Sequence, residues 1–173
     1  MSISLHTAII ETYQQILPKV ADLVTKAEEH CREQGQEAAA LTEACLAPDM
    51  WPFAKQIFEC GHHSARAIEG VRAGVFSPEP DPVASDFASL HKQIADSMAL
   101  VDSVAPDELD SIADRDMTFI FRDTTIPFTV SDFLFSFSLP NFFFHSTTAF
   151  NILRNNGIAI GKADFMGRLR IKA

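Results

Sequence analysis

The sequence predicts an all-α protein, a four-helix bundle with one small β-hairpin before the fourth helix. Two observations lead to this fold. Apolar residues recur at helical spacing in four long segments, and a pair of short β-branched and aromatic segments precedes the last of them. The length of 173 residues suits one core, and no internal repeat is found. We therefore expect a single bundle domain over residues 1–173.

The first long helix is predicted over residues 4–34, where apolar residues recur at steps of three and four. Gly35 follows directly and is a frequent helix terminator. Pro18 lies inside this helix, so we expect a kink there. The Ala-rich stretch 37–46 predicts a short helix in the connection that follows.

The second and third helices have readable starts and stops. The second is expected to run from about Pro52 to Ala73, with Asp49 as its cap and Pro52 near its first turn. Ser85 is the expected cap of the third helix, and Pro106 ends it.

Two short segments before the fourth helix are rich in β-branched and aromatic residues, 117–122 and 125–129. Asp123 and Thr124 separate them, which predicts a small β-hairpin. Pro127 cannot donate a backbone hydrogen bond, so its segment should be an edge strand.

The fourth helix is predicted from Thr129 to Gly157, in the most apolar part of the chain. Thr129-x-x-Asp132 fits a capping box, and Asn156-Gly157 fits a helix C-terminus. Pro140 lies between these signals. It predicts either a kink in the helix or a new helix that starts at the proline.

Phe residues are in surplus on the fourth helix, which carries seven of the fifteen. A bundle buries one broad stripe per helix, so the other rings need a cover. Either the hairpin and the C-terminal tail supply it, or a second subunit does. We predict a two-fold symmetric homodimer built on these faces.

The amino-acid composition argues against some classes of partner and indicates a cellular compartment. A formal charge of -9, from 14 Lys and Arg against 23 Asp and Glu, argues against a nucleic-acid surface and against anionic membranes. No apolar run is long enough for a membrane span, and the N-terminus does not resemble a signal peptide. Cys31, Cys45 and Cys60 are an odd number without paired spacing. We therefore expect reduced thiols in a cytoplasmic protein.

A polar stripe runs along this most hydrophobic helix. Ser138, Asn141, His145 and Thr148 recur at steps of three or four and fall on one face. A functional site should include this stripe. His145 is then either a metal ligand or pocket residue, or a buried imidazole that needs a hydrogen-bond partner.

On the second helix, Gln56, Cys60 and His63 share a face, whereas His62 is expected to point outward. We expect Gln56 to converge with Asn141 and His145 between the second and fourth helices. Cys60 and His63 could form a soft metal pair, although a small buried thiol is the commoner role for such a cysteine.

Three stretches carry a family resemblance: LAPDMWPFAKQ, LPNFFFHSTTAFNILRNNG and GIAIGKADFMG. Together they resemble an uncharacterised bacterial family within the DinB/YfiT-like superfamily, whose members are grouped as metalloenzymes. The resemblance implies a four-helix bundle, commonly dimeric. It also implies a divalent metal, Zn²⁺ or Ni²⁺, held by one His of helix two and two His of helix four. Some relatives are similar to thiol-dependent transferases.

Carried over residue by residue, the resemblance places His145 at the second helix-four ligand and Asn141 at the first. Gln56 lies near the helix-two ligand, with His63 two turns further on. Amide oxygens suit hard ions better than Zn²⁺ or Ni²⁺. The expectation is a degenerate metal site, with a small molecule bound near His145. The alternative is a metal-dependent enzyme, similar to thiol S-transferases, that uses His145 with His63 or Gln56. No catalytic residue, substrate or pathway is indicated.

Overall fold

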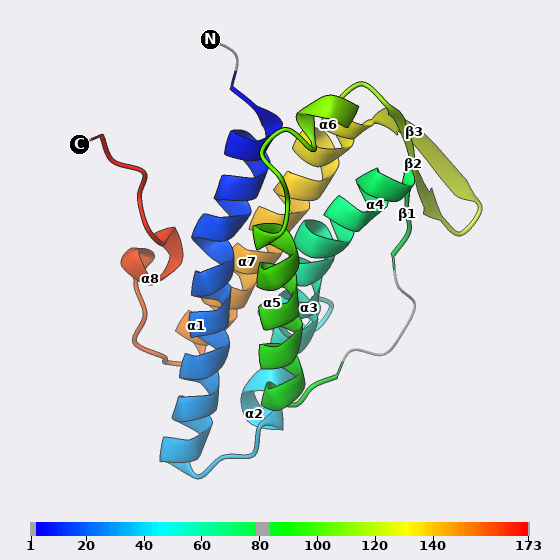
Figure 1. The fold of residues 1–173 in the computed structure, drawn as a ribbon. Coiled ribbons are helices and arrows are strands. Elements are labelled where there is room, and N and C mark those ends of the chain that lie inside the picture. Colours follow the sequence, from blue (N-terminus) through cyan, green and yellow to red (C-terminus); the bar gives the residue numbers. More distant parts are fainter. Residues whose placement is uncertain (1–2, 79–83, 173) are drawn as a thin grey trace.

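The computed structural model describes residues 3–78 and 84–172, and it is mostly helical with one small three-stranded sheet (Figure 1). Its elements follow in this order: η1 (His6–Ile10), α1 (Glu11–Gln34), α2 (Ala39–Thr42), α3 (Phe53–Gly61), η2 (His62–Arg66), α4 (Ala67–Ala73), β1 (Val75–Phe76), α5 (Phe87–Asp102), η3 (Asp110–Ile112), β2 (Asp116–Phe121), β3 (Thr124–Thr129), α6 (Val130–Asp132), η4 (Phe133–Ser138), α7 (Leu139–Asn155) and α8 (Lys162–Met166). η1, η2 and η4 are π-helical turns, and η3 is a 3-10 turn.

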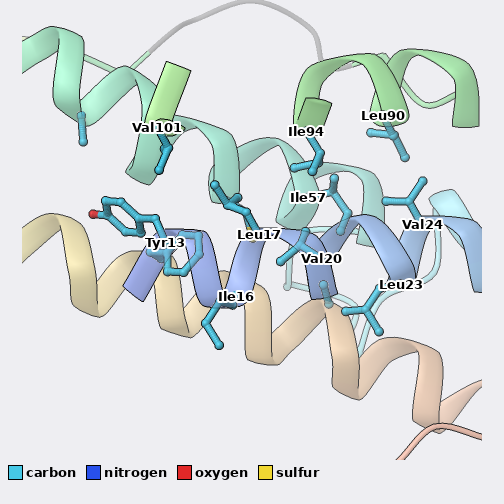
Figure 2. Close-up of a cluster of buried hydrophobic side chains, with 14 of the residues drawn as sticks. Tyr13, Ile16, Leu17, Val20, Leu23, Val24, Ile57, Leu90, Ile94 and Val101 are labelled. Atoms are coloured by element: carbon cyan, nitrogen blue, oxygen red, sulfur yellow. The ribbon is translucent and has the colours of Figure 1, made fainter. Parts of the chain in front are cut away.

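Four long helical segments lie side by side: α1, α3 with η2 and α4, α5, and α7 with η4 (Figure 1). α1 packs against α5, and α3 packs against both α5 and α7. Figure 2 shows the apolar seam of α1, with Leu17 and Val20 directed toward Ile57 of α3 and Ile94 of α5. The helical periodicity of the sequence thus identifies the buried faces. Among the described residues, no helix is long and apolar enough to cross a membrane.

The predicted hairpin is present as β2 and β3, and Pro127 lies on β3 at the edge of the sheet. The all-α description needs a correction, because β1 adds a third strand. Val75 pairs with Thr118 and Phe76 with Phe119, in parallel. A strand of two residues has no periodicity of its own that a sequence could reveal. It brings Phe76 against the hairpin, near the helix pair that carries the candidate site.

Side-chain caps and left-handed glycines mark several of the helix ends. Thr129 accepts a hydrogen bond from the backbone N–H of Asp132 at 3.1 Å, as the capping pattern predicted. Gly35 and Gly157 take the left-handed conformation just past α1 and α7. The predicted cap of α5 is off by one residue, because Asp86 rather than Ser85 accepts from the N–H of Ser89.

Pro140 lies in the first turn of α7, directly after η4. The helix does not break before it. The backbone stays helical through η4, where the N–H of Leu139 bonds to Leu134 across five residues. The second alternative, a new helix that starts at the proline, is therefore not what the structure shows, because residues 130–155 are helical without interruption. The kink stays a prediction. Pro18 lies within an uninterrupted α1.

The C-terminal segment lies beside α1, where Gln15 donates to the carbonyl of Met166 at 2.7 Å (Figure 1). Its short helix α8 places Phe165 against Phe150, so the tail covers part of α7. On the other side, β2 and β3 cover Phe133 and Phe137. Two rings of the surplus stay exposed, at 46% for Phe135 and 57% for Phe144. The homodimer stays a prediction.

Candidate metal centre

Three buried side chains from two facing helical segments converge beside the hairpin. Glu59 comes from α3, His63 from η2 and His145 from α7. Each offers one ligand atom, and these three atoms all lie within 4.8 Å of one another. Buried charged and polar groups rarely gather without a functional or hydrogen-bonding reason.

Glu59 divides its two carboxylate oxygens between different partners. Oε1 lies 2.6 Å from the Lys55 ammonium, and Oε2 lies 3.7 Å from His63 Nε2. Lys55 itself lies over the rings of Trp51 and Phe58, at 5.1 and 4.3 Å from their centroids. One cation therefore holds the carboxylate from the outside, while its other oxygen faces the histidines.

His145 is oriented by Gln56, which binds its Nδ1 at 2.7 Å through the amide oxygen. The amide nitrogen of Gln56 donates to the carbonyl of Trp51 at 3.0 Å, so the amide orientation is fixed. Since Gln56 presents an acceptor, Nδ1 of His145 must carry the proton. The lone pair then lies on Nε2, where a metal ligand needs it. The Trp51 ring stacks on this imidazole at 5.8 Å.

A π-helical turn places His63 in the site. In η2 the N–H of Ala67 bonds to the carbonyl of His62, five residues back. The carbonyl of His63 instead accepts from the Ser138 hydroxyl of η4 at 2.9 Å. Two π-helical turns therefore meet directly beside the site.

The expectation that His62 points outward is wrong. Its ring is buried against Phe58 and Phe76, and neither ring nitrogen has a hydrogen-bond partner among the described residues. A plain α-helix with His63 inward directs the preceding side chain about 100° away. η2 packs against both α5 and α7, so side chains on different faces of it, including both histidines, are buried.

Burial sets the charge of the site. It lowers the pKa of His63 to about 3 and the pKa values of His62 and His145 to about 4, with smaller contributions from neighbouring positive groups. All three imidazoles are therefore neutral at pH 7. Accordingly, the 3.7 Å contact of His63 with Glu59 is not an ion pair at that pH. Neutral imidazole is the form that binds metals.

A cavity of about 220 Å³ opens on the three groups. Its walls are largely aromatic and include Trp51, Phe76, Phe119, Phe137 and Phe144. His62 and Asn141 also line it, and His62 borders a second hollow of about 330 Å³ between η2 and α5. The candidate ligand atoms are thus buried in the protein but face open space on one side.

The structure assigns different positions to the residues singled out from the sequence. Gln56 and His145 are in contact, and His63 lies beside them. Asn141 lines the cavity, but its amide donates to the Phe137 carbonyl at 2.7 Å rather than to His145. Cys60 is fully buried, burial raises the pKa of its thiol, and it is not part of the ligand group.

Glu59 is the residue that sequence reasoning missed. Its signal was the spacing Glu59-x-x-x-His63, since side chains four residues apart lie on one helix face. Glutamate on a helix is usually exposed to solvent, so this spacing alone is weak evidence for a metal ligand. Only the packing of α7 against α3 shows that Glu59 is buried beside His145.

The three groups fit a divalent metal by donor type and by spacing. Tetrahedral zinc with bonds of 2.0–2.1 Å sets its ligand atoms roughly 3.4 Å apart. The 3.7 Å separation of Glu59 Oε2 and His63 Nε2 is close to that value. His145 is held with its Nδ1 protonated, which leaves the Nε2 lone pair for a metal, and the three ligand atoms lie within 4.8 Å of one another.

Comparison with known proteins identifies the family. The sequence profile described as "Domain of unknown function (DUF1993)" matches residues 5–166. The chain is also similar to a crystal structure of a DinB family member protein from Shewanella denitrificans. The TM-score is 0.80 at 21% sequence identity, over 98% of this chain and 95% of the other, which establishes a common fold. No curated protein matches the chain. The chain therefore belongs to the DUF1993 family.

Proposed function

We propose that this protein is a metal-dependent enzyme that holds a divalent first-row ion, with Zn²⁺ as the first candidate, between Glu59, His63 and His145. The proposal is based on the geometry of these side chains. Three buried ligand groups converge on one cavity, and Gln56 already holds His145 in the tautomer that a metal requires.

The donor set favours a catalytic site over a structural one. Structural zinc sites use four protein ligands, whereas catalytic sites use three and leave a position for water or substrate. Two imidazoles and one carboxylate are such a set, and the aromatic cavity lies on the open side. When bound, the ion would act as a Lewis acid that polarises a substrate oxygen or lowers the pKa of a bound water or thiol.

The surrounding side chains would position this set. Gln56 orients His145, and Lys55 holds Oε1 of Glu59 while Oε2 stays available. Trp51 covers one face of the His145 ring and so limits access of water from that side. Such outer contacts commonly contribute 10–100-fold to metal affinity.

This proposal favours the second of the two hypotheses drawn from the sequence. The degenerate-site interpretation counted amides at positions 56 and 141, and Glu59 now supplies a third ligand that it lacked. The first hypothesis, a small-molecule-binding protein without a metal, keeps one supporting observation. Lys55 already forms an ion pair with the Glu59 carboxylate, so this buried charge is compensated without a bound metal cation.

Metal analysis of protein purified without an affinity tag tests the proposal. We expect near-stoichiometric Zn²⁺ after dialysis against trace metal. Glu59→Gln, His63→Ala and His145→Ala should each lower the metal content and weaken Zn²⁺ affinity by at least about tenfold.

His91→Gln is the matched control, because His91 lies on α5 and pairs with Glu28 away from the cavity. It should bind metal as the wild type does. A wild-type protein that stays metal-free at micromolar Zn²⁺, Ni²⁺ and Fe²⁺ would leave the small-molecule-binding hypothesis as the better account.

A further inference from the structure

The cavity in front of the candidate metal ligands is suited to one kind of molecule. We propose that it takes a small planar aromatic anion, with its charged oxygen toward Glu59, His63 and His145 and its ring against the Phe side chains of the cavity wall. This inference rests on the proposed metal function and specifies its substrate class.

Size comes first. Engineered apolar cavities of about 150 Å³ are known to bind benzene. The cavity here is about 220 Å³, which leaves room for one aromatic ring with a carboxylate or a similar short substituent. A long chain or a fused-ring system would have to extend past the mouth into solvent.

The walls favour a flat ring. Phe119 and Phe137 lie 4.7 Å apart between centroids, and Phe76 lies 6.2 Å from Phe119, with these rings inclined at different angles. A planar ligand can meet such walls in stacked and edge-to-face contacts at once. At the mouth, Trp51 and Phe144 flank His145 and remain 52% and 57% exposed. Exposed aromatic rings beside a polar site are typical of binding surfaces.

The charges around the candidate metal site favour a negatively charged ligand. Metals are bound by neutral imidazoles, so Glu59 alone among the three ligands offsets a divalent ion, and one positive charge is left in excess. Lys55, bound to Glu59 at 2.6 Å, adds a second positive group nearby. An anionic oxygen from the ligand would compensate this excess, whereas an amine would increase it.

His62 adds a polar contact inside the cavity. It is buried, it lines the same space as the ligand group, and both of its ring nitrogens lack a partner among the described residues. Leaving such a group unpaired is costly, and a polar substituent on a bound ring would satisfy it. His62 is thus assigned a role in specificity, as a neutral donor or acceptor.

Cobalt(II)-loaded protein and benzoate test the inference, since the visible absorption of Co²⁺ changes when a ligand enters its coordination shell. We expect benzoate to bind at least about tenfold more tightly than acetate, which has the same charge but no ring. Benzylamine, with a ring and the opposite charge, should not bind. One of the three monohydroxybenzoates should bind more tightly than benzoate, and His62→Phe should abolish that gain.

Variants of the hairpin localise the ring. Phe119→Ala should weaken benzoate binding at least about tenfold, whereas Phe121→Ala should not, because Phe121 lies two residues further on β2 and is exposed. The comparison of ligands on the wild type needs no variant, so a misfolded mutant cannot mask the result.

Equal affinities for acetate and benzoate would overturn the inference while leaving the metal site intact. So would equal effects of the two Phe variants in folded protein. Absence of any cobalt absorption would overturn the proposed function and this inference together, and the two failures are therefore distinguishable.

Discussion

Gln56 and Glu59 lie three residues apart on α3, and each holds a different part of the candidate site. Gln56 binds Nδ1 of His145, and Glu59 places a carboxylate oxygen near His63. The sequence indicated Gln56 as a replacement for a metal ligand. In the structure it contacts His145, one of the candidate ligands, so its proposed role is to orient a ligand rather than to replace one.

Gln56→Leu tests that role. The substitution removes the acceptor for the His145 Nδ1–H but keeps the apolar bulk of the side chain, so Zn²⁺ affinity should fall by about 10–100-fold. Gln56→Glu keeps an acceptor at that position and should retain most of the affinity. Competition with a chromophoric chelator measures both.

Gln93→Leu is a suitable comparison, because Gln93 lies on α5 and donates to the Phe58 carbonyl outside the ligand group. Its Zn²⁺ affinity should equal that of the wild type. If Gln56→Leu behaves in the same way as Gln93→Leu, the contact with His145 is structural only.

Two π-helical turns, η2 and η4, lie against each other beside the candidate site. η2 belongs to the helical segment of Glu59 and His63, and η4 precedes the helix of His145. The Ser138 hydroxyl of η4 donates to the His63 carbonyl of η2, so a hydrogen bond joins the two turns. π-helical turns are rare and occur frequently at functional sites.

Ser138→Ala should therefore destabilise the protein by about 1–3 kcal/mol, because it leaves a buried carbonyl without its donor. Chemical denaturation measures the change in the free energy of unfolding. Ser136→Ala, two residues earlier in η4, removes a hydroxyl that bonds to its own helix on an exposed face. It should change stability by less than about 0.5 kcal/mol. Similar losses for both variants would contradict the special role of Ser138.

The elements differ in how far the sequence predicts them. Caps and terminators act locally, so Thr129, Gly35 and Gly157 could be identified from short patterns. β1 has only two residues and depends on pairing with β2, far away in sequence. Helical periodicity does not distinguish the π-helical turns from α-helical ones, so it does not predict them. The candidate site was predictable in part, since His145 and Gln56 follow from helical faces but Glu59 needs the tertiary contact.

At the scale of the whole molecule, the buried histidines couple stability to pH. Their pKa values are about 3 to 4 in the folded protein, against 6.5 for the ordinary imidazole. Below pH 6.5 the unfolded chain therefore binds more protons than the folded one. Stability is fully present above pH 6.5 and is lost as the pH falls toward about 4. The slope is up to about 1.4 kcal/mol per pH unit for each histidine.

Denaturation of metal-free protein between pH 7 and pH 4.5 measures this slope. Carboxyl groups with lowered pKa values, such as Glu11 and Asp164, titrate in the unfolded chain near 4.5 and 3.8, so the slope above about pH 5.5 belongs to the histidines. His62→Phe removes one of the three buried imidazoles, so it should reduce the slope by up to about 1.4 kcal/mol per pH unit. A flat stability profile over this window would mean that the three rings are hydrated.

The two π-helical turns also set the phase of the helices that follow them. An α-helix rotates by about 100° per residue, and a π-helical turn accommodates one residue more than an α-helical turn. Deleting one residue from η4 would therefore rotate α7 and turn His145 away from Glu59 and His63, although every ligand would still be present in the sequence. The spacing between motifs is thus as much a part of this site as the identity of its residues.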